Sequence, residues 1–479
     1  MCGFVGMIGV DHAAAAATVA LQSIQHRGQD AAGLAVWNHG DRRFHLWKDL
    51  GMVSQVLTPG VIRNMPGTAV IGHVRYPTMG GSKREDAQPF LSRIPGIVLC
   101  HNGNVTNVPQ LEDEVRKNGW HALSRCDSET ILLVLVDELV QLHMADHTAE
   151  NVATAVTQVM RRVHGSFSVA SVLEIDGQTT LLAFRDSYGI RPSVYGQNKE
   201  GAWMVASESV ALDVLGYEIR GHVPAGGMVL MRPGQDAIVQ ELVPRPARHC
   251  VFERIYFARA DSVMEEGRVN SARWRLGEQL AKEFTAKGLT ADVVVAIPDT
   301  SRPAAAAMSE ALGVPNREGF IKNRYSGRTF IMPDQSTRDA ALRLKLNPIR
   351  EVFEGRRVIL LDDSIVRGST MRRILSVLRA LGPTEIHLAI FSPAVRNPCF
   401  YGIDMPSHDE LIAAGRDPET LESGLAEHFG VESVTYLSVN GLREVAGDRV
   451  CDACFTGNYP IEVSDDERSF ILNDRRVTL

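Results

Sequence analysis

Short apolar runs alternate with amphipathic segments in the second half of the chain. Four apolar, partly β-branched residues at 358–361 predict a buried strand, and apolar residues at helical spacing over 371–381 predict a helix after it. Strands are likewise expected at 293–297 and 386–391, and a helix at 304–312. Strand and helix in alternation predict an α/β domain with a mostly parallel sheet, whose ligands bind at the carboxyl ends of the strands.

The first half shows a different pattern, in which short strands surround two early helices. Alternating runs between 166 and 185 flank Asp176-Gly177, which is a hairpin signal. Further strands are expected at 31–37, 203–207 and 228–231. These elements together favour an α+β sandwich.

A proline-rich, charged stretch at 243–246 separates the two patterns. At 479 residues the chain is long enough for two or three domains, each with its own core. We expect a first domain at 2–243, a second domain at 250–460 and a C-terminal tail at 461–479.

Composition narrows the class of protein. Hydrophobic residues make up 44% of the chain and charged residues 22%, an ordinary globular balance. The net charge of −7 disfavours non-specific binding to nucleic acid. The sequence has no apolar run of transmembrane length and no basic segment before an apolar one that would indicate a signal peptide. We therefore expect a cytoplasmic protein with no nucleic-acid or membrane partner.

The strand at 358–361 ends in two adjacent carboxylates, Asp362 and Asp363, and the loop S-I-V-R-G-S-T follows them. A loop between a strand and a helix start can hold a phosphate with backbone N–H groups. A P-loop is excluded because no lysine follows the glycine. Carboxylates beside an anion pocket suit a sugar phosphate, since they take ribose hydroxyls or Mg²⁺ while the loop takes the phosphate. The alternative is a strand that ends in a solvated acidic turn.

Two further segments belong with this loop. Thr300 and Ser301 follow the strand at 293–297, where their hydroxyls and amides could hold pyrophosphate. The basic, turn-rich stretch 322–338 begins with Lys322 and is expected to be a mobile lid; an ordinary solvated loop is the alternative.

The stretch 358–370 resembles the 5-phosphoribosyl 1-pyrophosphate (PRPP) signature of the type I phosphoribosyltransferases. This resemblance implies a PRPP site that includes Mg²⁺ held by Thr300, Asp362 and Asp363. The expected PRPP-binding residues are Thr300, Ser301, Lys322, Asp362, Asp363, Ser364, Arg367, Gly368, Ser369 and Thr370.

Cysteine is the second residue of the chain, after Met1. We expect Met1 to be removed, which would leave a thiol and a free α-amine on Cys2. Such an amine has an unperturbed pKa of about 7.7–8.0, which suits a general base. One residue would then supply both nucleophile and base. The alternative is a small residue in a first strand.

Motifs at 26–30, 72–76, 101–104 and 126–129 follow Cys2 in an order that resembles the class II glutamine amidotransferases, whose fold is an N-terminal-nucleophile sandwich. The resemblance covers about the first 240 residues. It implies that Cys2 attacks the glutamine carboxamide, that Asn102 and Gly103 form the oxyanion hole, and that Arg75 and Asp127 bind the glutamine α-carboxylate and α-ammonium groups. Arg27 lies in one of these motifs and is given no role.

The remaining chemistry is in four cysteines, since Cys451 and Cys454 form a C-x-x-C pair and Cys399 and Cys250 lie upstream. A set of four cysteines suits zinc or an iron–sulfur cluster, and the alternative is that the four thiols are buried and bind no metal. Their positions resemble those of the iron–sulfur-containing amidophosphoribosyltransferases, which implies a 4Fe–4S cluster.

The whole chain resembles the amidophosphoribosyltransferase family. This resemblance implies synthesis of 5-phosphoribosylamine from PRPP and glutamine-derived ammonia, with release of pyrophosphate and glutamate, as the first step of de novo purine biosynthesis. It also implies feedback by purine nucleotides and a homotetramer. One departure is that only Met1 precedes Cys2. The alternatives are a PRPP-sensing regulator and an amidotransferase that makes glucosamine 6-phosphate.

Overall fold

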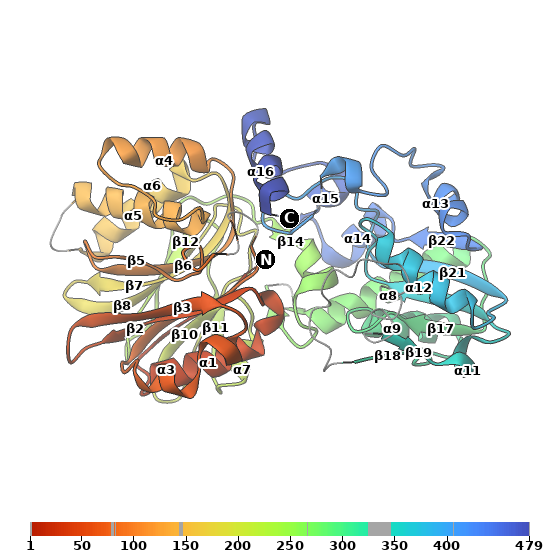
Figure 1. Ribbon diagram of the computed structural model, residues 1–479, viewed down its shortest axis with the longest axis horizontal. Helices are drawn as coiled ribbons and strands as arrows, with labels where there is room; N and C mark the ends of the chain where they lie inside the picture. Colours follow the sequence, from red (N-terminus) through yellow and green to blue (C-terminus); the bar gives the residue numbers. More distant parts are fainter. Residues whose placement is uncertain are drawn as a thin grey trace.

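The computed structural model describes residues 2–77, 81, 83–142, 147–265, 267–323, 346–405 and 407–478, with side chains up to residue 474. Two lobes lie side by side, one built from the first half of the sequence and one from the second (Figure 1). The predicted lid at 322–338 lies almost wholly outside the described residues.

The first lobe contains two antiparallel sheets that face each other. A shared core of apolar side chains lies between them, and each sheet carries helices on its outer face. One sheet has the order β11 (Glu218–His222), β9 (Val194–Gln197), β10 (Trp203–Ala206), β1 (Gly3–Ile8), β4 (Ala69–Arg75), β2 (Ala31–Asn38) and β3 (Arg43–Leu50). The other has the order β13 (Ile238–Glu241), β12 (Gly227–Met231), β8 (Gln178–Arg185), β7 (Gly165–Ile175), β6 (Ile97–Val105) and β5 (Phe90–Ser92).

Helix α1 (Ala13–Ser23) covers the first sheet, and α4 (Val108–Lys117), α5 (Asp127–Leu142) and α6 (Ala149–Arg162) cover the second. The predicted α+β sandwich is therefore present. The expected hairpin joins β7 to β8, and its turn residues Asp176 and Gly177 both have positive φ, 51° and 68°, as a two-residue I′ turn requires.

The second lobe is built around a parallel sheet with the order β17 (Val293–Ala296), β20 (Arg357–Asp362), β21 (Glu385–Ile390) and β22 (Ser433–Tyr436). Apolar side chains alternate between its two faces, and helices cover both. Helices α12 (Ser369–Arg379) and α13 (Leu421–Phe429) lie on one face, and α8 (Val269–Ala286), α9 (Arg302–Leu312) and α14 (Val439–Ala446) on the other. This sheet confirms the predicted α/β domain.

Short elements complete the chain. They are α2 (Val53–Val56), α3 (Pro59–Arg63), α7 (Val210–Asp213), β14 (His249–Cys250), β15 (Val263–Met264), β16 (Gly267–Arg268), β18 (Phe320–Lys322), β19 (Leu346–Pro348), α11 (Arg350–Phe353), β23 (Val450–Cys451) and α15 (Ala453–Thr456). A single π-helical turn, η2 (Glu253–Phe257), follows β14.

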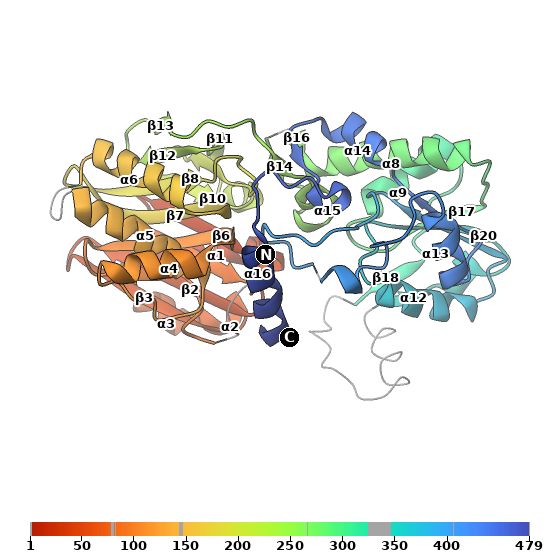
Figure 2. The same cartoon turned by 90° about the horizontal axis from the view of Figure 1, so that it is seen from above.

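The tail expected at 461–479 contains a helix, α16 (Asp465–Thr478), which lies between the two lobes in both views (Figures 1 and 2). Within the described residues, no helix is long and apolar enough to cross a membrane.

Candidate functional site

Cys2 lies directly before β1, and β1 pairs with β4, so that the cysteine is brought to the end of β4 beside Arg75. The Cys2 thiol is 8% exposed and donates a hydrogen bond to the backbone carbonyl of Tyr76 at 3.4 Å. Burial acts against the charge of Arg75, but Cys126 and Cys2 nearby, with Asp86 and Asp127, raise the pKa of the guanidinium above its ordinary value. The structure thus brings Cys2, Arg75 and Asp127 together.

Asn102 and Gly103 lie within β6. Both polar atoms of the Asn102 side chain are buried and have no hydrogen-bond partner among the described residues. At Gly103 an added Cβ would lie 1.9 Å from the carbonyl oxygen of Ser166 on the paired strand β7, so only glycine fits there. A buried amide without partners beside a close-packed backbone is suited to receive a ligand.

Asp127 begins α5, and its Oδ2 accepts the backbone N–H of Val105 at 3.0 Å. His101 lies beside it, with Nε2 3.7 Å from Asp127 Oδ2 and Nδ1 2.6 Å from Ser128 Oγ. Burial lowers the pKa of His101 below its ordinary value although Asp127 opposes this, so the imidazole is neutral near pH 7.

Asp86 is a residue of this region that the sequence did not indicate. It is 2% exposed, its Oδ1 accepts the backbone N–H of Arg125 at 2.9 Å, and its Oδ2 has no hydrogen-bond partner in the part of the chain that the structure describes. Asp86 also contributes to the raised pKa of Arg75. No periodicity or motif distinguishes Asp86 from the polar residues that precede it.

Arg27, which received no role from its motif, is fully buried and bonded to three groups. Its Nε donates to the carbonyl of Cys2 at 2.9 Å, its Nη2 donates to Glu253 at 2.7 Å, and its Nη1 bonds Glu208. Glu253 belongs to η2 in the second half of the chain. Arg27 therefore links the backbone of Cys2 to the other lobe through a buried ion pair.

In the second lobe, Asp362 ends β20 and Asp363 follows it. Thr300 donates a hydrogen bond to Asp363, and Ser301 donates to Asp362 Oδ1 at 3.4 Å, so the loop after β17 and the loop after β20 meet at these carboxylates. Ser364 Oγ donates to Asp363 Oδ1 at 2.6 Å. The hydroxyls expected near the acidic pair are therefore present.

The acidic pair is electrostatically strained. Burial and the neighbouring Asp363 raise the pKa of Asp362 well above its ordinary value. Burial also raises the pKa of Asp363, although Ser364, Thr300 and Arg273 oppose it. A cation between the carboxylates would relieve this repulsion, which is a physical reason to expect a metal-bound ligand here.

The loop turns into α12 at Gly368, whose φ is 75° and whose added Cβ would lie 2.6 Å from Ile412 Cδ1. The expected residues Ser369 and Thr370 form the first turn of α12, where backbone N–H groups lack partners within the helix. Two residues that were expected to bind PRPP form ion pairs with other side chains in this structure. Arg367 Nε donates to Glu410 at 3.0 Å, and Lys322 Nζ donates to Asp299 at 2.8 Å.

A cavity of about 930 Å³ contains this loop and extends to the first lobe. Its walls include the acidic pair, the loop after β17 and η2, together with His26 and Tyr76 of the first lobe. Tyr76 accepts the Cys2 hydrogen bond with its carbonyl and donates from its hydroxyl to Asp404 Oδ2 at 2.9 Å. Tyr76, which lines the cavity, is therefore also in direct contact with the Cys2 thiol.

Comparison with known proteins agrees with this two-centre arrangement. Residues 74–214 match the glutamine amidotransferase domain, and residues 270–397 match the phosphoribosyl transferase domain. The amidophosphoribosyltransferase of Synechococcus elongatus is 40% identical over 93% of this chain and 88% of its own length. That of Methanothermobacter thermautotrophicus is 39% identical over 97% of this chain and 95% of its own. The chain belongs to the amidophosphoribosyltransferase family.

Two solved structures share the fold over nearly the whole chain. One is described as the allosteric regulatory enzyme of purine biosynthesis, with a TM-score of 0.86, 34% identity and 97% of each chain covered. The other is glutamine PRPP amidotransferase from B. subtilis complexed with ADP and GMP, with a TM-score of 0.85, 34% identity, and 97% of this chain and 98% of that one covered.

The predicted enzyme is thereby confirmed. It is a glycosyltransferase with a glutaminase half-reaction, and it makes 5-phosphoribosylamine from glutamine and PRPP, the first step of de novo purine biosynthesis. The PRPP-sensing regulator and the glucosamine 6-phosphate enzyme are set aside, because this chain matches both domain families and its relatives over nearly its full length are named amidophosphoribosyltransferases.

The four cysteines of the C-terminal half, all of them described in the structure, are buried and form no disulfide bond. Cys250 on β14 is the register partner of Cys451 on β23. Burial raises the pKa of the Cys454 thiol, and Cys399, Cys250 and Cys451 add to this, which places the four sulfurs within electrostatic reach of one another. Within the described ranges, no three His, Cys, Asp or Glu side chains form a group compact enough to hold a metal ion.

The segment after Cys399 packs directly on the first lobe. Asn104 Nδ2 donates to the carbonyl of Phe400 at 3.0 Å, and Ser166 Oγ donates to the carbonyl of Tyr401 at 2.7 Å. At Gly402, where φ is 98°, an added Cβ would lie 2.8 Å from the carbonyl oxygen of Gly103. The cysteine region thus adjoins the strand that carries Asn102 and Gly103.

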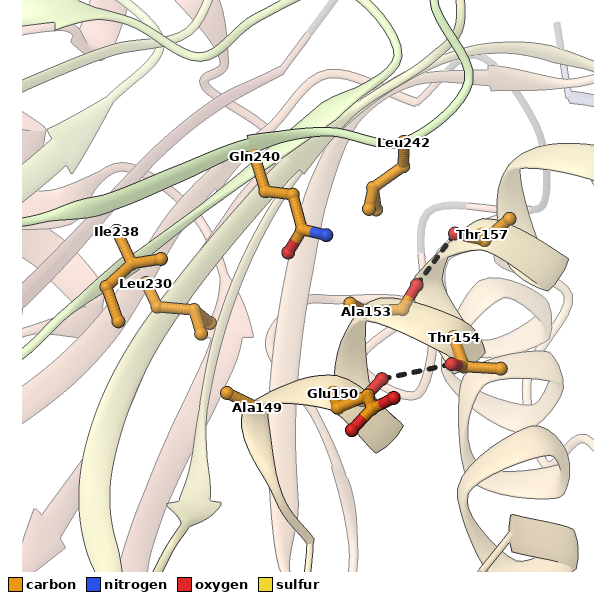
Figure 3. Close-up of a pocket in the computed structure, with 9 residues that line it drawn as sticks. All are labelled: Ala149, Glu150, Ala153, Thr154, Thr157, Leu230, Ile238, Gln240 and Leu242. Atoms are coloured by element: carbon orange, nitrogen blue, oxygen red, sulfur yellow. Dashed lines mark hydrogen bonds between the residues drawn. The ribbon is translucent and has the colours of Figure 1, made fainter.

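A second hollow, of about 370 Å³, lies between α6 and the β12–β13 edge, away from both centres (Figure 3). The hydroxyls of Thr154 and Thr157 bond carbonyls of their own helix, and Glu150 is the one titratable side chain among the residues that line it. Few polar groups converge there, so we assign this hollow no part in the reaction.

Proposed function

We propose that Cys2 is the nucleophile that attacks glutamine. The ammonia released from glutamine then reaches PRPP at Asp362 and Asp363 through the 930 Å³ cavity. One observation carries this proposal. The cavity wall that holds the acidic pair also includes Tyr76, whose carbonyl accepts the hydrogen bond of the Cys2 thiol.

In the first half-reaction the Cys2 sulfur adds to the glutamine carboxamide. The unpartnered Nδ2 of Asn102 and the N–H of Gly103 would stabilise the tetrahedral oxyanion; donors of this kind each lower the barrier by about 2.7–4 kcal/mol. Collapse expels ammonia and leaves a thioester, which water hydrolyses to glutamate and the free thiol. After removal of Met1, the Cys2 α-amine would take the thiol proton and pass it to the leaving nitrogen.

Arg75 and Asp127 are proposed to hold the glutamine backbone. A guanidinium fork suits a carboxylate, and the Asp127 carboxylate suits an ammonium group. Asp86, which is buried and contributes to the raised pKa of Arg75, would add to the negative charge near that ammonium group. These charges orient glutamine so that its carboxamide lies at Cys2.

In the second half-reaction ammonia adds to the anomeric carbon of PRPP as pyrophosphate leaves. The start of α12, with Gly368, Ser369 and Thr370, is proposed to bind the 5-phosphate, and Thr300 and Ser301 the pyrophosphate. Asp362 and Asp363 fit a Mg²⁺ ion because their carboxylates repel each other in its absence. When bound, Mg²⁺ supplies charge neutralisation for the pyrophosphate leaving group.

Arg367 and Lys322 are proposed to exchange their present partners for the substrate. Both of these ion pairs are largely exposed, with side chains 43–48% accessible. Exposed pairs of this kind contribute about 0–1 kcal/mol, so a polyanionic substrate can replace them at little cost.

The four buried thiols Cys250, Cys399, Cys451 and Cys454 are proposed to hold a 4Fe–4S cluster. Zinc needs all its sulfur ligands at about 2.3 Å from one point. Four buried sulfurs in mutual electrostatic reach suit a cluster that takes one thiolate on each iron. The backbone N–H of Tyr401, which lies 3.4 Å from Cys399 Sγ, would stabilise a bound thiolate.

Regulation and assembly are proposed by likeness. The B. subtilis relative was solved with ADP and GMP, which supports purine nucleotides as feedback inhibitors of this chain as well. The homotetramer and the cytoplasmic location remain predictions.

The test compares two variants. Cys2→Ala should lose glutamine-dependent synthesis and keep synthesis from free ammonia, because only the glutamine half needs the thiol. Asp362→Asn with Asp363→Asn should lose both. Glutamine-dependent activity in Cys2→Ala would disprove the nucleophile, and unchanged PRPP affinity in the double variant, measured by calorimetry, would disprove the PRPP site.

A further inference from the structure

Helix α16 is fixed to both lobes. In Figures 1 and 2 it lies at the junction between them, beside the end of β6. Phe470 packs against the core of the first lobe and against the core of the second, and Ile471 is fully buried. Because α16 packs against both lobes, a displacement of one lobe can move the helix and its contacts with the other lobe.

Glu467 in the first turn of α16 uses its two carboxylate oxygens differently. Oε2 accepts the backbone N–H of Ser464 at 2.7 Å, while the backbone N–H of Glu467 donates to Ser464 Oγ at 3.3 Å. This reciprocal pair is a capping box. Oε1 instead accepts Thr106 Oγ1 at 3.2 Å and lies 3.1 Å from His164 Nδ1, both in the first lobe.

The carboxylate is buried and charged. Glu467 is 5% exposed, and burial alone would raise its pKa, but the Ser464 N–H and His164 hold the pKa below its ordinary value. A hydrogen bond to a charged, buried acceptor is stronger and more directional than one at the surface. The contact with Thr106 therefore fixes the position of that residue.

Thr106 directly follows β6, the strand that contains Asn102. The backbone N–H of the intervening Val105 donates to Asp127 at 3.0 Å. A shift of Thr106 would thus move the strand that carries Asn102 and the hydrogen bond that orients Asp127. Glu467 itself touches neither of these groups.

A second contact of α16 leads to the same region. Asp474 pairs with Arg125 at 3.1 Å, and the backbone N–H of Arg125 donates to Asp86. The Arg125 side chain is 64% exposed, so this pair contributes little by itself. The buried contact of Glu467 is the stronger of the two.

We propose that Glu467 is a positioning residue for the glutamine half-reaction, acting through Thr106 on the strand of Asn102 and Gly103. The inference rests on the proposed roles of Asn102, Gly103 and Asp127. It assigns to the C-terminal helix a function in glutamine chemistry although the helix follows the phosphoribosyltransferase domain in the sequence.

The test uses Glu467→Gln, which keeps an acceptor for the capping box but loses the charge and the second acceptor, and Thr106→Val, which removes only the hydroxyl. Each should lower glutamine kcat/KM by about tenfold, mainly through kcat, since small displacements of catalytic groups cost ~10²-fold or less. Ammonia-dependent synthesis should be unchanged. The double variant should be no worse than the single ones, because both remove one interaction.

Asp466→Asn is the matched control, because it removes an exposed carboxylate from the same first turn and the same helix dipole. It should leave glutamine kinetics unchanged. Three outcomes would each overturn the inference. The first is unaltered glutamine kinetics in Glu467→Gln and Thr106→Val, and the second is additive losses in the double variant. The third is a parallel loss of glutamine-dependent and ammonia-dependent synthesis. Glutamine use that survives in Cys2→Ala would instead refute the proposed site itself, so the two failures are distinguishable.

Discussion

Tyr76 and Asp404, which belong to different lobes, are joined by a 2.9 Å hydrogen bond from the tyrosine hydroxyl to the carboxylate. The same tyrosine accepts the Cys2 thiol with its backbone carbonyl, 3.4 Å from the sulfur. One residue therefore contacts the proposed nucleophile with its main chain and the other lobe with its side chain. A movement of Asp404 would therefore shift Tyr76 and, with it, the carbonyl that accepts the Cys2 hydrogen bond.

Tyr76→Phe tests this connection. Loss of the hydroxyl removes an exposed hydrogen bond to a carboxylate, worth about 0.5–1.5 kcal/mol. We expect PRPP to stimulate the glutaminase less in this variant, while ammonia-dependent synthesis is retained. Steady-state assays of glutamine hydrolysis with and without PRPP measure the effect. Asp404→Ala should behave alike, and normal stimulation in both variants would contradict the connection.

Asp362→Asn should stabilise the ligand-free protein while it abolishes synthesis. Burial and repulsion from Asp363 raise the pKa of Asp362, so the folded state favours the protonated form. Stability of the ligand-free protein then falls as pH rises through the raised pKa, by about 1.4 kcal/mol for each unit of pKa shift. Thermal unfolding over a pH series should show a higher Tm for the variant at neutral pH. Asp299→Asn, which changes a half-exposed carboxylate, is the control, and a lower Tm for Asp362→Asn would refute the strain.

The same carboxylates give ligand affinity the opposite pH slope. Mg²⁺ requires the charged forms of Asp362 and Asp363, and their raised pKa values delay ionisation as pH rises. Affinity for Mg²⁺–PRPP should therefore weaken on acidification at a higher pH than ordinary aspartates would produce. Calorimetric titration between neutral and mildly acidic pH measures this, and an affinity that stays constant over that interval would count against the metal assignment.

The cysteine site predicts a visible property. Protein purified without oxygen should be brown and contain about four iron atoms per chain, the stoichiometry of a Cys₄-ligated 4Fe–4S cluster. Cys451→Ser should lose the colour, whereas Cys100→Ser, which changes a buried thiol of the first lobe, should keep it. Colourless active protein with one zinc ion per chain would establish the zinc alternative.

Arg27→Met should destabilise the fold strongly. Arg27 is fully buried between Glu208 and Glu253, and removal of one partner from a buried pair costs about 3–5 kcal/mol. Burial alone would raise the pKa of Glu208, but Arg27 and His26 outweigh it and hold the pKa below its ordinary value. This stabilisation is present above the pKa of an unfolded glutamate and is lost as pH falls, so wild type and variant should converge in acid.

Denaturant unfolding measures the difference between Arg27→Met and wild type. Arg116→Met is the control, because Arg116 forms an exposed pair with Asp113 worth about 0–1 kcal/mol. Equal free energies of unfolding for the two variants would show that the buried pair contributes nothing special.

Periodicity predicted most of the fold because each strand and helix has to bury an apolar face. The strand expected at 358–361 is β20 and the helix at 371–381 is α12, with ends shifted by about two residues, which is usual where capping decides the boundary. The polar residues at 101–104 continue β6, because β7 pairs with them and a carbonyl of the other lobe accepts a hydrogen bond from Asn104 Nδ2. Such tertiary partners leave no trace in local sequence.

The site residues that sequence reasoning missed share one property. Asp86, Glu253 and Glu467 are acidic residues whose partners lie far away in the chain. Their burial depends on lobe packing, which no local pattern encodes. The S-D-D-E capping signature at 464–467 would have indicated the start of α16, but only the fold shows that the second oxygen of Glu467 reaches Thr106.

The close approach of Gly402 to the carbonyl of Gly103 bears on how the two halves could be recombined. A single methyl group at Gly402 would lie 2.8 Å from that oxygen and would wedge the lobes apart. A chimera that joined this glutaminase half to another transferase would therefore need the segment around Gly402 transplanted as well. A cut at the linear boundary near 243–250 alone would separate Gly103 from the glycine that packs against it.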